Sequence, residues 1–360
     1  MLLVGAAALG LLIALVVGKG PRDWVVALVT TLTAAFTLIP ALVWTIAKLV
    51  GSPLQNLIVT NILGDAARYF DTSPASVQAR QTVRDTGLEL LNELHDRGRY
   101  GRIIVYGHSL GSVIAYDILG HAWTRRSRLH ASADTMRTPA LRTVEDLLNP
   151  RDEDDTSPPV EEIRARQHAA WREFTGNGFE WRVSDLVTAG SPLTHARWLL
   201  NPPKGTEFDQ VIADRSMPTC PPQTSQIRSA RPGHARRTFT FTFTFTYHVE
   251  GDHRPHSVLV PDHGALFALV RWTNVYFPHR GLIRGDPVGG PVAPTFGNWV
   301  HDVALPHPGA GIAGFAHTKY VDTSHTNAHV AELRAALELP MHADITWWLL
   351  LSLEDEAMRA

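Results

Sequence analysis

Ser109 stands in a Gly-x-Ser-x-Gly pattern, written Gly107-His108-Ser109-Leu110-Gly111. The apolar run at residues 102–106 is typical of a parallel strand buried on both faces, and a helix is expected from residue 112 to 119. A sharp turn between them would expose the serine hydroxyl beside the positive end of the helix dipole. We therefore expect Ser109 to be a nucleophile and the NH group of Leu110 to be one oxyanion donor.

A serine hydroxyl becomes reactive when a base takes its proton, and that base needs an orienting carboxylate. After a nucleophile in a strand-turn-helix context, the acid and then the histidine follow on loops after later strands. Asp286 lies in a glycine-rich loop directly after a predicted strand at 271–277. Asp302 falls within a strand-like run, and Asp262 precedes a helix that it can cap. We therefore expect Asp286 to be the acid, with Asp302 as the less favoured alternative.

The base must be chosen among 18 histidines. His317 follows the last predicted strand, at 299–305, which suits the order of the three residues. His325 and His329 lie at or inside the closing helix predicted at 328–339. His317 is the expected base and His325 the alternative.

Apolar periodicity predicts helices that alternate with short apolar strands, and this alternation favours an α/β fold with a mainly parallel sheet flanked by helices. Residues 124–177 are polar and are interpreted as an excursion from the core, and a Thr-Phe alternation indicates a half-buried strand at 238–247. The other elements expected are a helix at 76–96, a strand at 183–189 and a helix end at 265–270.

These motifs resemble those of the lipase and esterase branch of the α/β-hydrolases, in particular class 3 type lipases and bacterial membrane-linked relatives. The matching pieces are Gly-His-Ser-Leu-Gly at 107–111, the strand end at 188–192, the loop at 285–290 and the pair His317 and Tyr320. The resemblance implies an α/β-hydrolase fold over about residues 64–340. It also implies a triad of Ser109, Asp286 and His317 that cleaves a carboxylic ester through an acyl-enzyme, without cofactor or metal.

One feature departs from that family. Such folds place several strands before the nucleophile strand, and a loop among them supplies the second NH group of the oxyanion hole. Here only the apolar N-terminus and residues 51–99 come before it, so the second donor is not assigned. A fold permuted around its membrane segment and a start at an internal methionine are the two hypotheses.

Two apolar runs, at residues 1–18 and 24–50, are each long enough to cross a bilayer as a helix. They predict a membrane anchor of two transmembrane helices within residues 1–50, followed by the catalytic domain at residues 51–360. A membrane-bound hydrolase favours a lipid or another small apolar ester as substrate.

The basic residues that flank these runs bear on membrane orientation. Lys48 and Arg68 favour a cytoplasmic catalytic domain at a bacterial inner membrane, whereas Lys19 and Arg22 in the connecting turn argue for the opposite orientation.

The charges exclude some function classes. The chain has 33 basic and 35 acidic residues, which are interspersed and leave a net charge of -2, so no field gathers nucleic acid. The Arg-rich stretch at 228–237 is interpreted as a solvated loop. Cys220 is the single cysteine, and its Pro-rich setting favours a structural role.

Two other functions stay open. A non-catalytic membrane protein that retains a hydrolase fold would explain the unassigned oxyanion donor. A metal-dependent hydrolase would use a cluster of possible ligands that lacks the helical His-Glu-x-x-His pattern. These ligands are His248, Asp252, His253, His256, Asp262 and His263.

Overall fold

The structure is a computed structural model of the chain. It describes residues 64–71, 73–126, 138–149, 158–199, 208–228, 235–238, 241–248, 254–279, 285–306, 316–321 and 328–339. All of them belong to one compact unit, Asn61–Arg280 with Arg284–Ala360. Within these ranges, no helix combines the length and apolar character that a membrane crossing requires. Both predicted transmembrane runs lie outside the described residues.

A four-stranded parallel sheet forms the centre, in the order β1-β2-β7-β8. β1 begins with an apolar run and β2 is buried along its whole length, as is typical of a parallel sheet covered on both faces. The expected strand at 102–106 continues for two further residues, since Gly107 and His108 still pair with β2. The strands are β1 (Ile103–His108), β2 (Val183–Ala189), β7 (Arg271–Tyr276) and β8 (His301–Ala304).

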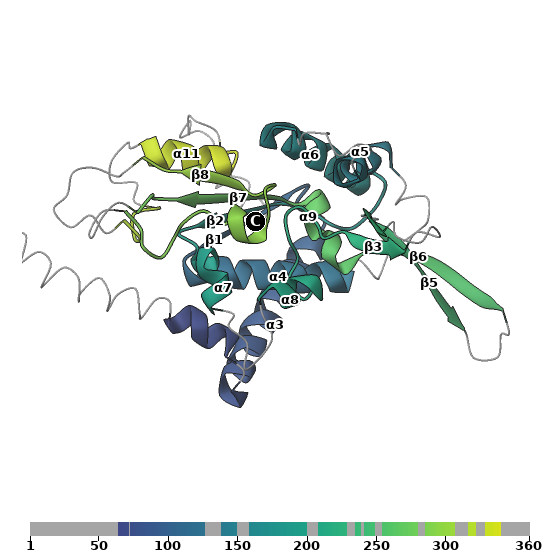
Figure 1. Cartoon of the computed structure of the whole chain (residues 1–360), viewed down its shortest axis with the longest axis horizontal. Coiled ribbons are helices and arrows are strands. Elements are labelled where there is room, and N and C mark those ends of the chain that lie inside the picture. Colours follow the sequence, from purple (N-terminus) through teal and green to yellow (C-terminus); the bar gives the residue numbers. More distant parts are fainter. Residues whose placement is uncertain are drawn as a thin grey trace, which may run out of the picture. The chain divides into compact units, whose positions relative to one another are not determined.

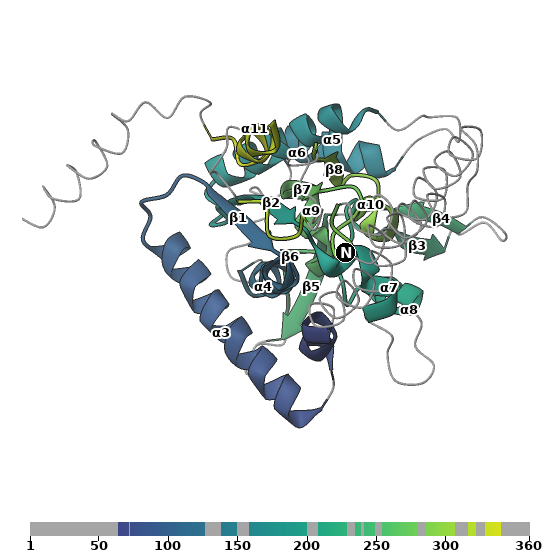
Figure 2. The same cartoon turned by 90° about the vertical axis from the view of Figure 1, so that its left-hand side faces the viewer.

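Helices flank the sheet, as expected for a mainly parallel α/β arrangement (Figure 1). On one face, α3 (Pro74–Asp96) packs against α4 (Leu110–Arg126), which directly follows β1 and contacts it. On the other face lies α11 (Ala328–Ala336), whose Leu333 packs into a cluster with Val187 of β2 and Val275 of β7. Figure 2 shows α3 and α4 beside β1, with α11 away from them across the sheet.

The predicted excursion contains two helices, α5 (Pro139–Leu148) and α6 (Val160–Gly176). Their apolar faces, including Val144 and Trp171, join the main hydrophobic core. Short helical segments connect the remaining elements near the strand ends. They are η1 (Pro192–His195), α7 (Ala196–Leu199), α8 (Phe208–Ala213), η2 (His263–Ala265), α9 (Leu266–Leu269) and α10 (Ala293–Phe296).

Two antiparallel hairpins lie outside the parallel sheet. β5 (Thr242–His248) pairs with β6 (Pro255–Pro261), so the Thr-Phe alternation does contain a strand, which begins at Thr242. β3 (Ser225–Arg228) pairs with β4 (Ala235–Thr238). The interpretation of 228–237 as a loop is therefore wrong at both ends, because backbone pairing between the two short segments overrides their polar composition.

Candidate active site

The turn between β1 and α4 holds Ser109 in an unusual backbone conformation. Its φ angle is 54°, in the left-handed region that residues with a side chain rarely adopt. The Ser109 NH group donates to the Ala189 carbonyl (3.0 Å), and its carbonyl accepts from the Ser112 NH group (2.9 Å). A β-carbon at Gly107 would lie 2.6 Å from the Gly111 carbonyl oxygen. The small residues of the motif therefore permit a bend that sets Ser109 apart from both elements.

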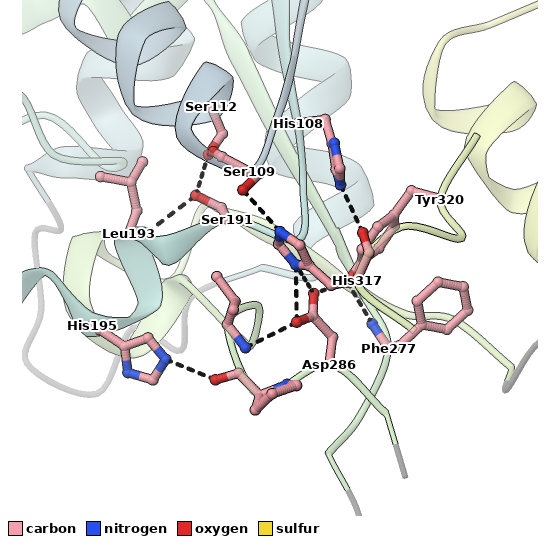
Figure 3. A network of polar contacts seen from close by, with 12 residues as sticks. His108, Ser109, Ser112, Ser191, Leu193, His195, Phe277, Asp286, His317 and Tyr320 are labelled. Carbon is pink, nitrogen blue, oxygen red and sulfur yellow. Dashed lines mark hydrogen bonds and ion pairs between the residues drawn. The ribbon is translucent and has the colours of Figure 1, made fainter. Parts of the chain in front are cut away.

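His317 lies between Ser109 and Asp286 (Figure 3). Its Nε2 is 2.8 Å from the Ser109 Oγ, and its Nδ1 is 2.9 and 3.0 Å from the two carboxylate oxygens of Asp286. An ionised carboxylate only accepts hydrogen bonds, so Nδ1 carries the proton and Nε2 accepts from the Ser109 hydroxyl. The structure thus brings together the three residues that the sequence analysis selects from distant parts of the chain.

The parallel sheet explains how these side chains meet. Ser109 follows β1, Asp286 follows β7 and His317 follows β8. The carboxyl ends of parallel strands share one edge of the sheet, which is the usual place for ligand sites in open α/β sheets. Asp286 is fully buried and His317 is 3% exposed, so water has little access to their contact.

Three donors surround the Asp286 carboxylate. His317 Nδ1 is joined by the Tyr320 hydroxyl (2.8 Å) and the Val288 NH group (2.9 Å). Burial by itself would raise the pKa of Asp286, but the hydrogen bond and charge of His317, with the other two donors, hold that pKa below its ordinary value. The carboxylate is therefore ionised at neutral pH and ready to stabilise a protonated His317.

Tyr320 links this carboxylate to the end of β7. Its hydroxyl accepts from the Phe277 NH group (3.0 Å) while it donates to Asp286. Burial raises the pKa of Tyr320 far above its ordinary value, and the neighbouring Asp286 charge adds to this, so the phenol stays neutral and keeps its proton to donate. Gly190 (φ 54°) makes room, because a β-carbon there would lie 2.6 Å from the Tyr320 ring.

His108 anchors the segment that carries the base. Its Nε2 lies 2.8 Å from the carbonyl oxygen of His317, and since a carbonyl only accepts, this nitrogen is the donor. Its ring also packs against the rings of His317 and Tyr320, with centroids 5.1 and 5.4 Å apart. Burial lowers the pKa of His108, so its ring is neutral at neutral pH.

The beginning of α4 is tied to the end of β2. The Ser112 hydroxyl donates to Ser191 Oγ (2.7 Å), and Ser191 Oγ also accepts from the Leu193 NH group (3.2 Å). Leu110 is the first residue of α4, so its NH group has no partner within the helix and can face an oxyanion next to Ser109. In the described part of the chain no strand precedes β1, and the second oxyanion donor stays unassigned.

The alternative acids have structural roles. Asp302 accepts from the NH groups of Val292 and Ala293 (2.9 Å each) and from the Asn274 side chain (2.7 Å). Asp262 caps η2 by accepting from the Gly264 NH group (2.7 Å), as its position before a helix predicts, and it pairs with Arg215. Among the described residues, neither of these two carboxylates contacts His317.

Of the other two candidate histidines, only His329 is described. It is buried in α11, where its ring packs on Phe277 at 5.5 Å, and His325 lies outside the described residues. Of the possible metal ligands, Asp252 and His253 also lie outside, and no group of three histidine, cysteine or acidic side chains able to hold a metal occurs among the residues described. Cys220 is buried, and burial raises the pKa of its thiol, which fits a structural role.

Two residues of the site, His108 and Tyr320, have no role that the sequence predicts. The sequence does show that His317 and Tyr320 are three residues apart, and both lie in the short segment 316–321. This spacing is the one signal that could have linked Tyr320 to the site. His317 contacts Ser109 and Asp286, and Tyr320 contacts the same Asp286 carboxylate and the Phe277 NH group. These contacts depend on where β7 ends, which the spacing does not indicate.

Comparison with known protein families, with curated proteins and with solved structures found no match.

Proposed function

We propose that this chain is a serine hydrolase of the α/β-hydrolase kind, which cleaves a carboxylic ester through an acyl-enzyme. The contact of Ser109 Oγ with His317 Nε2 at 2.8 Å, backed by Asp286, is the observation that carries the proposal. The order of the three residues, and their places after β1, β7 and β8, agree with the pattern of that fold.

In this mechanism, Ser109 Oγ attacks the ester carbonyl carbon while its proton passes to His317 Nε2. The carbonyl oxygen gains a negative charge and accepts a hydrogen bond from the Leu110 NH group. The C–O bond to the alcohol then breaks, and His317 returns the proton to the departing oxygen. Water next attacks the acyl carbon and gives a proton to His317. The bond between that carbon and Ser109 Oγ then breaks, the acid departs and His317 returns the proton to Ser109 Oγ. Asp286 stays ionised throughout and stabilises the imidazolium.

The substrate in this proposal is a lipid or another small apolar ester. Its support is the pair of long apolar runs at residues 1–18 and 24–50, which would hold the protein at a bacterial inner membrane, with the catalytic domain on the cytoplasmic side.

Labelling with a fluorophosphonate probe tests the proposal. The full chain in detergent should be labelled covalently, and Ser109→Ala should abolish the labelling. Ser76→Ala is the matched control, since Ser76 lies in the first turn of α3, where it contacts Ser73 and Asp71, and should leave labelling unchanged. A folded full chain that does not react, or a Ser109→Ala variant that still reacts, would contradict the proposal.

A non-catalytic membrane protein with the same fold is the second candidate, favoured by the unassigned second oxyanion donor. The loss of one such donor typically costs about 10²–10³ in rate. Labelling without any turnover of short-chain and long-chain esters would favour this candidate, whereas turnover that Ser109→Ala abolishes would exclude it.

A further inference from the structure

The strand that leads to Ser109 has an open side among the described strands. β1 stands first in the order β1-β2-β7-β8, so β2 is its one partner there. The Ser109 NH group donates to Ala189, and along a strand successive residues face alternate sides. Val105 and Gly107 therefore pair with β2, whereas the NH and carbonyl groups of Ile104 and Tyr106 point toward the open side.

The side chains around the open side of β1 are apolar, whereas the edge strands of natural sheets usually carry features that prevent another strand from pairing with them. These features are charges, prolines or bulges. β1 has a register shift at its start, between Ile103 and Ile104, but its residues from Ile104 to Tyr106 include no charge and no proline. A cavity of about 360 Å³ runs along this edge between α3, β1 and α4, and no charged residue lines it. Leu90 of α3 lines it and is 57% exposed. The Tyr106 hydroxyl, which is buried, has no hydrogen-bond partner within the described part of the chain.

The chain leaves the described structure next to this edge. Glu338 forms ion pairs with Arg102, directly before β1, and with Arg271 at the start of β7 (2.6 Å for the latter). Leu339 is the last described residue, so the residues that follow start at the amino end of β1. Residues 340–344 span up to roughly 17 Å when extended, enough to reach the open side.

The segment that follows matches the edge in character and length. Residues 345–353 read Ile-Thr-Trp-Trp-Leu-Leu-Leu-Ser-Leu and contain no charge. Aromatic and β-branched residues favour strands, and an uncharged run suits a strand covered on both faces. β1 itself has six residues, so the segment is long enough to pair along all of it.

The face of the sheet on which α11 packs agrees with a connection from β8, through α11, to the open edge of β1. Crossovers between parallel strands are almost always right-handed. The connection from β1 to β2 runs toward β8 in the strand order and has α4 on one face of the sheet. A connection from β8 to the open side of β1 runs in the opposite direction along the strand order. It is therefore right-handed only if its helix lies on the other face. α11 follows β8 and packs on that other face, against Val187 and Val275.

We propose that residues 345–353 bind along the open edge of β1 as a fifth parallel strand and cover the apolar cavity. This pairing does not require Ser109 to be reactive, so it stands apart from the proposed hydrolase activity.

Hydrogen exchange resolved to single amides tests the pairing with an internal control. In the full chain in detergent, the amides of Ile104 and Tyr106 should be protected, as are those of Val105 and Gly107, which donate to β2. In a chain that ends at Leu339, the Ile104 and Tyr106 amides should exchange at least about tenfold faster, and the Val105 and Gly107 amides should stay protected. Equal exchange of Ile104 and Tyr106 in both chains would overturn the proposal.

Point variants check the same pairing in the full-length chain. Thr346→Pro removes a backbone donor within the segment and should expose Ile104 and Tyr106, whereas Glu356→Pro, beyond the segment, should not. On the other partner, Leu90→Glu places a charge at the cavity and should have the same effect. Val83→Glu is its control, because Val83 is also an exposed apolar residue of α3 but does not line the cavity.

Other occupants of the edge would give other results. A second copy of the chain would make protection of Ile104 and Tyr106 rise with protein concentration, together with a dimer in light scattering, and this protection would survive truncation at Leu339. That result would overturn the assignment to residues 345–353.

Discussion

Tyr320 donates its hydroxyl hydrogen to the Asp286 carboxylate at 2.8 Å, at the same oxygen that lies 2.9 Å from His317 Nδ1. The same hydroxyl accepts from the Phe277 NH group, so the carboxylate is held against the end of β7. The orientation of His317 therefore depends on a residue only three positions along the same turn.

Removing the Tyr320 hydroxyl should destabilise the ionised Asp286 carboxylate. Burial disfavours the charge of this carboxylate, and one of the three donors that stabilise the charge would be lost. In Tyr320→Phe we expect kcat to fall about tenfold with little change in KM, since a hydrogen bond to a charged group contributes about 1.5–3 kcal/mol. The pKa of Asp286 should rise, so activity at the acidic end should be lost at a higher pH than in wild type. A pH profile of ester hydrolysis measures this. Tyr106→Phe is the matched control, because the Tyr106 hydroxyl has no partner among the described residues, and a similar loss there would refute the role of Tyr320.

His108 should position His317 through a single donated hydrogen bond. His108→Phe keeps a ring against His317 and Tyr320 but removes the donor to the His317 carbonyl. We expect kcat/KM to fall roughly tenfold or more, since a small misplacement of a catalytic group has large effects on rate. His108→Gln, which restores an NH donor, should recover part of the activity in the same assay. Equal activities of the two variants would show that the donor has no such role.

The choice between the two acids can be tested directly. Asp286→Asn should lower kcat by about 10⁴, because an amide no longer favours the required tautomer or stabilises the imidazolium. Asp302→Asn should retain most activity and lose thermal stability instead, since Asp302 accepts from two backbone NH groups at the start of α10. Steady-state kinetics and melting curves of both variants separate the two roles. The reverse pattern would assign the acid to Asp302.

Gly190 should not tolerate a side chain. In Gly190→Ala the new β-carbon would lie 2.6 Å from the Tyr320 ring and 2.9 Å from an Asp286 oxygen, and the left-handed backbone adds about 1–2 kcal/mol of strain. We expect a lower melting temperature and loss of probe labelling at Ser109. Gly101→Ala is the control, because a β-carbon there meets nothing within 4 Å and its backbone needs no glycine. Wild-type labelling by Gly190→Ala would contradict the close packing of the site.

The ion pairs of Glu338 should make stability depend on acid pH. The hydrogen bond from Arg102, with further support from Arg271, lowers the pKa of Glu338 to about 2 from an ordinary 4.5. Because the folded state favours the carboxylate, the stabilisation is complete above pH 4.5 and is lost as the pH falls toward 2. Glu338 is 43% exposed, so solvent screening limits the contribution to about 1 kcal/mol or less.

Urea unfolding of wild type and Glu338→Gln at several pH values measures this contribution. The difference between the two proteins should be largest at neutral pH and should shrink between pH 4.5 and 2. Glu93→Gln, which breaks an exposed ion pair with Arg97 at the end of α3, should show no comparable difference. A difference for Glu338→Gln that is unchanged at pH 2 would rule out the ion pairs as its cause.

The sequence by itself determined the local elements of this protein. Apolar runs marked β1, β2 and β7, the helical spacing marked α3, and the pattern around Ser109 marked the turn before α4, because each depends on residues close together in the chain. The expected chain order of nucleophile, acid and base also selected Asp286 and His317 from many acids and histidines. These two side chains lie beside Ser109 because a parallel sheet brings the carboxyl ends of its strands to one edge.

The tertiary structure alone decided what depends on packing between distant segments. The Tyr320 contact with Asp286, the His108 bond to the His317 carbonyl and the hairpin at 225–238 arise from neighbours that no local pattern reveals. The position of β1 at an open edge is of the same kind, since strand order is set by crossover connections and not by the composition of any one strand. Local free energies choose helix, strand or turn, whereas burial and hydrogen bonding across the sheet choose which of these segments meet.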